Sequence, residues 1–135
     1  MELAVTMDAL QALLDESPFN RQYGFRVHNI GDGVCTVLVP HQPIFERPDG
    51  LVSGPVFMAA ADVAMWLAIQ TRTGIIDRLV TVEMKTNFLT GARNTDVFCL
   101  ATVLKLGRRL IYGTAECRDV AGTLLTHHTL TYIRP

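Results

Sequence analysis

A single acidic residue, Asp62, lies inside the stretch GPVFMAAADVAMWLAI, in which every other residue from Gly54 to Ile69 is apolar or small. Burying an ionised carboxylate without a partner is costly, so Asp62 must be paired, protonated or open to a wet cleft. In a wet cleft the carboxylate is available as a general base or a nucleophile. The alternative without chemistry is a paired carboxylate at a contact between subunits.

The other side chains that could do chemistry do not predict a site of their own. His127 and His128 are adjacent in a β-rich run, where neighbouring side chains point to opposite faces and cannot easily chelate one ion. Ser53 is not enclosed by a GxSxG turn, and no acid is evident to orient a histidine beside it. We therefore expect neither a metal site nor a serine nucleophile.

Composition narrows the class of protein. The 135 residues suit one domain, residues 1–135. Twelve Lys and Arg against 13 Asp and Glu give a formal net charge of -1, which does not favour nucleic acid as a partner. Charged residues make up only 19% of the chain and hydrophobic residues 49%, so we expect some apolar surface to be buried in a homo-oligomer.

The expected compartment is the cytoplasm. Three widely spaced cysteines without a CxxC pair are typical of reduced thiols. The N-terminal segment has acidic residues where a signal peptide has a basic region and then an apolar run. The one candidate for a membrane span, Leu51–Ile69, contains Pro55 and Asp62, so we expect no membrane span.

The first half of the chain predicts a helix, a hairpin and a second helix. Leucine spacing predicts a helix from Met7 to about Glu16, and two β-rich runs, Phe25–Ile30 and Val34–Val39, flank a Gly-rich turn. The segment Gly54–Ile69 is rich in Ala and Met and has Pro55 in its first turn, which favours a helix. Because it is apolar all round, this helix should be the buried axis of the domain.

The second half predicts strands only. Four β-rich runs are joined by Gly-containing connections: Leu79–Leu89, Val97–Leu106, Leu110–Arg118 and Thr123–Ile133. With the hairpin they predict an α+β fold, in which an antiparallel sheet of about six strands wraps around one long central helix.

This order of elements, together with AAADVAMWLA and LGRRL, resembles the PaaI-type acyl-CoA thioesterases, which have the hotdog fold. The resemblance runs from about Leu10 to Ile133. Asp62 in AADVA matches the family's LADxA carboxylate, nine residues after the start of an HGG motif that reads Ser53-Gly54-Pro55 here. The resemblance implies an acyl-CoA substrate, no cofactor beyond the coenzyme A of that substrate, and a dimer or dimer of dimers with active sites at the dimer seam.

The resemblance also assigns roles to residues. The backbone N–H of Gly54 would polarise the thioester carbonyl, and Asp62 of a neighbouring subunit would activate water or attack directly. Thr81 matches a polar position that lines the cleft, and Arg108 and Arg109 match a turn that contacts the phosphates of coenzyme A.

Three positions depart from the family pattern. Ser53 replaces the motif histidine and is expected to cap the helix or hold a water. Pro55 has no N–H to donate. Arg47 stands where the family has asparagine, and it is expected to bind a phosphate or carboxylate or to pair with Asp62 across the seam.

Met58 and Trp66 lie four residues before and after Asp62 and share its helix face, so they are candidates for an acyl pocket, with core packing as the alternative. Two other functions stay open. A non-catalytic acyl-CoA-binding or lipid-binding hotdog protein fits the replaced histidine and asparagine. A hydratase or dehydratase is less favoured because no histidine with a paired acid is evident.

Overall fold

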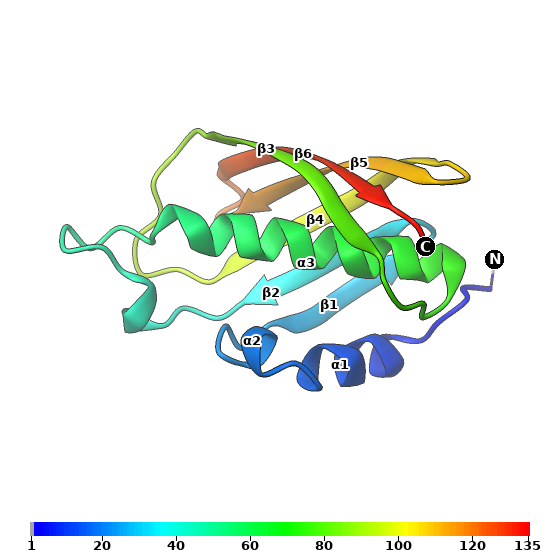
Figure 1. Cartoon of the computed structure of the whole chain (residues 1–135). Coiled ribbons are helices and arrows are strands. Elements are labelled where there is room, and N and C mark those ends of the chain that lie inside the picture. The colour runs from blue at the N-terminus through cyan, green and yellow to red at the C-terminus, as the bar shows by residue number, and fades with distance from the viewer. Residues whose placement is uncertain (1) are drawn as a thin grey trace.

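The computed structural model describes residues 2–135 and shows an antiparallel sheet curved over one long helix (Figure 1). The helices and strands, in chain order, are α1 (Met7–Asp15), α2 (Pro18–Arg21), β1 (Arg26–Gly31), β2 (Val34–Val39), the 3-10 helix η1 (Pro43–Phe45), α3 (Gly54–Thr73), β3 (Val80–Phe88), β4 (Val97–Leu106), β5 (Leu110–Arg118) and β6 (Leu124–Ile133). The predicted α+β architecture is confirmed. Three strands, β2, β4 and β5, have the predicted bounds.

Buried apolar side chains alternate with less buried ones along the strands, so that one face of the sheet packs on the core. In β4, Val97, Cys99 and Ala101 are buried, while the side chains between them are only half-buried. The strand order is β1-β2-β4-β5-β6-β3, and every neighbouring pair is antiparallel. The two edges of the sheet are therefore β1 and β3, and α3 crosses from β2 to the far edge.

The helix α3 packs against the concave face of the sheet through small side chains. Ala60, Ala64 and Ala68 are 0% exposed, and their size lets the helix approach the strands closely. At Gly113 of β5 an added Cβ would lie 2.4 Å from Met65 Cε, so a larger residue there would push helix and sheet apart. The helix is longer than predicted and runs to Thr73, because Gln70 and Thr71 are also buried.

The expectation that α3 is buried on every side is wrong. One stripe of the helix is left uncovered by the sheet: Met58 is 39% exposed, and Asp62 and Trp66 are half-buried. The curved sheet covers only one side, and α1 packs mainly on β1 (Figure 1). By length and composition α3 resembles a membrane span, yet it is the core helix of this fold, with 67% of its most apolar window buried.

Candidate active site

Two hydroxyl groups from the sheet hold the carboxylate of Asp62. Thr81 Oγ1 donates to Asp62 Oδ1 at 2.6 Å, and Tyr132 Oη lies 2.6 Å from the same oxygen. Thr81 on β3 and Tyr132 on β6 are directly paired across the two strands, so both side chains point to the helix. A bulge in β3 between Thr81 and Glu83 lets the next inward residue, Met84, regain the helix-facing side.

Tyr132 is a hydrogen-bond donor to Asp62. Tyr132 has one hydroxyl hydrogen, which it donates either to Asp62 Oδ1 or to the backbone carbonyl of Asp62 at 2.8 Å. Burial, and then the neighbouring carboxylate of Asp62, raise the pKa of Tyr132 above its usual value, so it stays a donor. Within residues 2–135 the other oxygen, Oδ2, makes no hydrogen bond.

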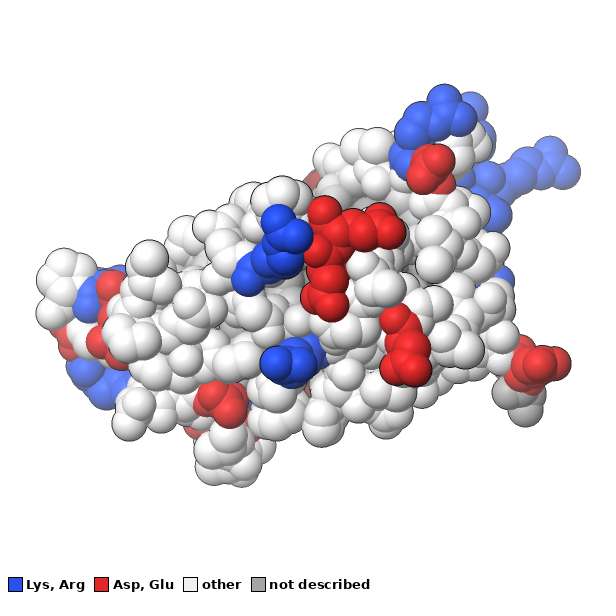
Figure 2. Space-filling model, turned by 90° about the horizontal axis from the view of Figure 1, so that it is seen from below, with Lys and Arg blue, Asp and Glu red and all other residues white. Residues whose placement is uncertain are grey.

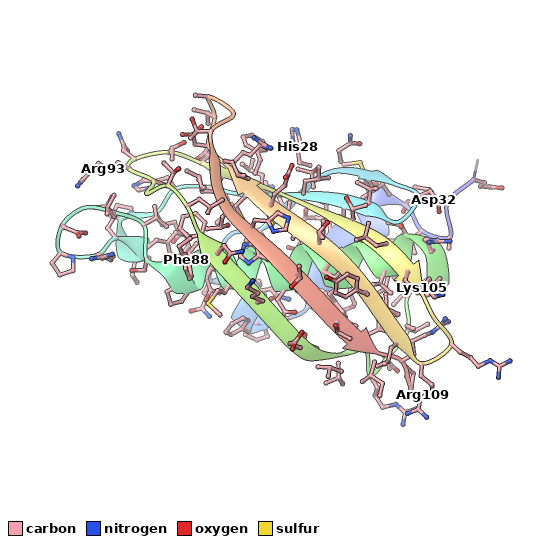
Figure 3. All side chains as sticks on the ribbon, turned by 90° about the horizontal axis from the view of Figure 1, so that it is seen from above. His28, Asp32, Phe88, Arg93, Lys105 and Arg109 are labelled. Carbon is pink, nitrogen blue, oxygen red and sulfur yellow. The ribbon has the colours of Figure 1, made fainter. Side chains whose placement is uncertain are left out.

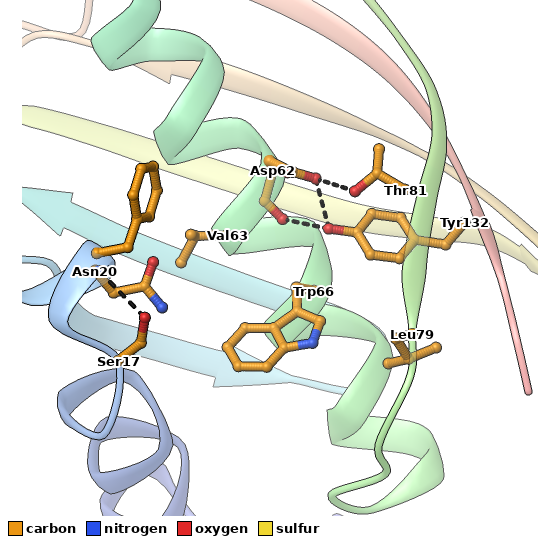
Figure 4. A pocket seen from close by; sticks show the side chains of 9 residues that line it. Ser17, Asn20, Asp62, Val63, Trp66, Leu79, Thr81 and Tyr132 are labelled. Atoms are coloured by element: carbon orange, nitrogen blue, oxygen red, sulfur yellow. Dashed lines mark hydrogen bonds between the residues drawn. The ribbon is translucent and has the colours of Figure 1, made fainter.

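Asp62 opens onto a cavity of about 400 Å³, called here the Asp62 cavity (Figure 4). Its walls come from the α1–α2 region, from α3 and from the end of the sheet. The lining residues are Ser17, Phe19, Asn20, Asp62, Val63, Trp66, Leu79, Thr81 and Tyr132. The structure therefore brings three of the predicted site residues together: Asp62, Thr81 and Trp66.

Gly54 lies elsewhere, on a second cavity of about 420 Å³, called here the Gly54 cavity. Arg47, Phe57, Phe88 and Thr126 are among the residues that line it. The N–H of Gly54, at the first position of α3, has no acceptor within residues 2–135. An added Cβ at Gly54 would lie 3.1 Å from Phe88 Cε1, so close packing also favours glycine here.

The capping role expected for Ser53 is wrong, and its alternative role of holding a water stays a prediction. The side chain of Ser53 makes no capping hydrogen bond; its backbone carbonyl accepts from the N–H of Val56 at 3.1 Å instead. Arg47 makes an exposed ion pair with Asp49 of the same chain, in which Nη2 lies 3.0 Å from Oδ2. Its predicted pairing with Asp62 across the seam between subunits stays a prediction. The position of Arg47 on the Gly54 cavity is compatible with the predicted phosphate role.

Met58 lines neither the Asp62 cavity nor the Gly54 cavity of the single chain, and its predicted place in an acyl pocket stays a prediction. Its side chain is 39% exposed because it projects from the uncovered stripe of α3. Trp66, two turns further along the helix, does line the Asp62 cavity and shares its wall with Val63.

Arg108 and Arg109 lie in the turn between β4 and β5 and are exposed (Figure 3). The N–H of Arg134 donates to the carbonyl of Arg109 at 2.7 Å, which places the turn beside the end of β6. Tyr132 lies two residues before Arg134, so these arginines are at the end of the sheet that holds the Asp62 carboxylate. Phe88, in contrast, lies towards the other end of β3 (Figure 3).

His127 and His128 point to opposite faces, as their spacing predicts. His128 is 0% exposed; its Nδ1 lies 2.8 Å from Thr86 Oγ1 and its Nε2 lies 2.8 Å from Thr126 Oγ1. Both ring nitrogens are therefore satisfied by core hydroxyls. Across residues 2–135, no group of three or more His, Cys, Asp or Glu side chains is arranged to hold a metal ion.

Charge is dispersed on the face that carries α1 and α2. Figure 2 shows Lys and Arg interspersed with Asp and Glu between wide uncharged areas. The long-range field over this face is accordingly weak, and recognition there depends on local contacts.

Sequence reasoning missed six of the nine residues that line the Asp62 cavity, among them Tyr132 and Asn20. Tyr132 occupies an inward position of β6, in step with Leu130, and a buried tyrosine needs a partner for its hydroxyl. That alternation was the available signal. Asn20 comes from a short helix whose position against α3 no local pattern indicates.

Comparison with known proteins gives the family. The family model described as the Thioesterase superfamily matches residues 49–126. The chain is 31% identical over 99 residues to a protein of Saccharolobus solfataricus named "Putative esterase SSO2140", covering 73% of this chain and 70% of that protein. This chain belongs to the thioesterase superfamily.

Solved structures agree on the fold. The conserved protein PA5202 from Pseudomonas aeruginosa superposes with a TM-score of 0.83 at 28% identity, covering 88% of this chain and 94% of that one. A mutant of the phenylacetic acid degradation protein PaaI from Thermus thermophilus superposes with a TM-score of 0.79 at 23% identity, covering 88% of this chain and 100% of that one. The predicted hotdog fold, with its central helix and short N-terminal helix, is confirmed.

Proposed function

We propose that this chain is a PaaI-type acyl-CoA thioesterase in which Asp62 is the catalytic carboxylate. The observation that carries the proposal is the arrangement of Asp62: Thr81 and Tyr132 fix Oδ1, while Oδ2 makes no hydrogen bond within residues 2–135 and the residue lines a cavity. Because Asp62 is only half-buried, a carboxylate at this position can keep one oxygen without a protein partner. This one is oriented and keeps one oxygen available for a reaction.

The reaction has two forms, both of which Asp62 can perform. As a general base, Oδ2 takes a proton from water, the hydroxide adds to the thioester carbonyl, and the tetrahedral intermediate expels the coenzyme A thiolate. As a nucleophile, Oδ2 adds to the carbonyl itself and the tetrahedral intermediate expels the coenzyme A thiolate, which leaves a mixed anhydride. Water then cleaves the anhydride, releases the acid and restores the carboxylate of Asp62. In both forms the developing oxyanion needs a hydrogen-bond donor.

The Gly54 N–H is our proposed donor, contributed by a second copy of the chain. Within one chain Gly54 and Asp62 line different cavities. The strand β3 is a sheet edge that pairs only with β6, and exposed apolar side chains such as Val82 and Phe88 lie along it. An unpaired edge is a template for another strand.

Antiparallel pairing of two β3 edges would complete the site. Thr81, beside Asp62, lies at the start of β3, and Phe88, beside Gly54, lies at its end. In an antiparallel pair about a twofold axis, the start of one strand meets the end of the other. The Asp62 cavity of one copy would then adjoin the Gly54 cavity of its partner, which gives a homodimer with two composite sites.

The remaining site residues have proposed roles in binding. Arg108 and Arg109 lie at the same end of the sheet as Asp62 and are free to contact the phosphates of coenzyme A. Arg47 borders the Gly54 cavity, where it would contribute a positive charge. Trp66 would form a wall for the acyl group. All three cysteines are buried free thiols, which supports the proposal of a cytoplasmic location.

Free-thiol release from aromatic, short, medium and long acyl-CoAs tests the proposal. Wild type should release coenzyme A from at least one ester class, and Asp62→Asn should release much less. The matched control Asp8→Asn, which changes an exposed aspartate of α1, should behave as wild type. Saturable binding of acyl-CoA without release from any ester would favour the non-catalytic binding protein instead.

A further inference from the structure

The Asp62 cavity is lined by an amide that the proposed reaction does not use. Asn20 is only 8% exposed, and its side-chain amide makes no hydrogen bond with any of residues 2–135. The residue lines the Asp62 cavity, so the amide is left to pair with water or with a ligand there. An amide can donate two hydrogen bonds and accept others, and all of this capacity is unused by the fold.

The local structure does not need this side chain. The backbone of Asn20 is satisfied by its neighbours: its N–H donates to Ser17 Oγ at 3.4 Å, and its carbonyl accepts from the N–H of Tyr23 at 3.2 Å. An apolar side chain of similar size would fill the same space against α3 without an unpaired amide. The amide therefore serves neither to cap α2 nor to link it to the core.

The direction of the amide indicates what it meets. Figure 4 shows it turned towards Val63 and Trp66, across the cavity from Asp62 and its two hydroxyl partners. The wall between these polar groups is apolar and is formed by Val63 and Trp66 (Figure 4). A mostly apolar pocket with a few polar groups placed at its ends is typical of a site that fixes the orientation of a ligand.

We infer that Asn20 is a specificity-determining residue that hydrogen-bonds a neutral polar substituent, such as a hydroxyl, at the far end of the acyl group. This inference rests on the proposed thioesterase function, because it takes the thioester to lie at Asp62. A neutral substituent fits because no Lys or Arg lines the Asp62 cavity to pair with a carboxylate. The substrate class is therefore acyl-CoAs that carry a hydrogen-bonding group remote from the thioester, with a plain hydrocarbon chain as the poorer substrate.

Paired esters test the inference. In each pair the acyl chains have equal length and end in a hydroxyl or a methyl group, and a ladder of lengths finds the pair that spans from Asp62 to Asn20. At that length wild type should prefer the hydroxyl ester by ~3- to 10-fold in kcat/KM, the range for one neutral hydrogen bond. The variant Asn20→Leu should bring the ratio to about 1 or below by impairing the hydroxyl ester while sparing the methyl ester.

Two further variants separate recognition from structure. Asn29→Leu, at an exposed position of β1, should keep the wild-type ratio. Asn20→Asp keeps an acceptor but loses the amide donors, so it serves if the leucine variant does not fold, and a reduced ratio is expected. A ratio that is the same in wild type, Asn20→Leu and Asn20→Asp at every length overturns the inference.

Failure of the inference differs from failure of the proposed function. If esters are hydrolysed but the hydroxyl preference does not depend on Asn20, the thioesterase stands and the inference falls. If no ester is hydrolysed, the proposed function falls, and calorimetric binding of the same paired esters to wild type and Asn20→Leu then decides the role of Asn20. Equal affinity of the two proteins for the hydroxyl ester overturns it.

Discussion

The phenolic oxygen of Tyr132 lies 2.6 Å from Oδ1 of Asp62, although the two residues are 70 positions apart in the chain. The contact exists because β6 and β3 pair side by side and direct Tyr132 and Thr81 to the same point on α3. The carboxylate of Asp62, inside an apolar helix, thereby acquires hydrogen-bond donors from β3 and β6. The orientation of the carboxylate, and with it the proposed chemistry, depends on these donors.

Replacing Tyr132 by phenylalanine should weaken the fold and the reaction together. The loss of a hydrogen bond to a charged group is expected to lower the free energy of unfolding by about 1.5–3 kcal/mol and to reduce kcat. Urea denaturation and thioester hydrolysis measure the two effects. Tyr112→Phe, on the outward side of β5, is the matched control because Tyr112 is 41% exposed. Equal stability of the two variants would contradict the role given to Tyr132.

Thr81 and Tyr132 should act as a coupled pair, because both hydroxyls lie at one oxygen of Asp62. We expect Thr81→Val to lower kcat, and the double variant Thr81→Val/Tyr132→Phe to differ from the sum of the single effects by about 0.5–3 kcal/mol. Thr129→Val, a half-buried position of β6, is the control. Strict additivity of the Thr81 and Tyr132 effects would show that the hydroxyls do not share a function.

Stability should fall at alkaline pH because of buried acids. Burial raises the pKa of the Cys35 thiol from 9.0 to about 12. At pH values between these two, the unfolded chain loses the thiol proton and the folded chain keeps it. The free energy of unfolding should be insensitive to Cys35 below pH 9 and should then fall by up to about 1.4 kcal/mol per pH unit as pH rises towards 12. Tyr132, whose pKa is also raised, adds to the fall.

Denaturation curves of wild type and Cys35→Ala between pH 7 and pH 11 measure this dependence. The variant should be less stable at neutral pH because of the cavity, but its stability should fall less steeply above pH 9. Parallel curves for the two proteins would mean that Cys35 does not contribute.

Mixing two inactive variants should restore activity if each site is shared. Gly54→Val blocks the proposed donor and Asp62→Asn the carboxylate, so each homodimer has two defective sites. In a heterodimer of the two variants, one site carries both changes and the other carries neither. Random mixing makes about half of the dimers heterodimers, and one of their two sites is intact, so about a quarter of the wild-type activity should return. Absence of any recovery, although heterodimers have formed, would place Gly54 and Asp62 of the same chain in one site.

The sequence predicts the fold well because the signals for its elements are local. Val97–Leu106 alternates between buried and half-buried side chains along most of its length, and Gly54–Ile69 has the composition and first-turn proline of a buried helix. The uncovered stripe of α3 was not predictable, since an apolar helix face has the same composition whether a sheet or another subunit covers it.

The site was predicted in part. The resemblance and the helix spacing named Asp62, Thr81 and Trp66, which do line one cavity. Tyr132 and Asn20 were missed because their positions depend on pairing between distant strands and on how α2 packs. The capping role of Ser53 was wrong because its side chain makes no hydrogen bond to the first turn of α3.

The most direct test of the central claim compares turnover and binding in Asp62→Asn. Asparagine keeps the shape of the side chain and cannot act as a base, so kcat for the best acyl-CoA should fall by ~100- to 10,000-fold while the affinity for that ester changes little. A variant that binds the ester as wild type does but no longer hydrolyses it would support Asp62 as the catalytic carboxylate. Retention of full hydrolysis in Asp62→Asn would contradict the account.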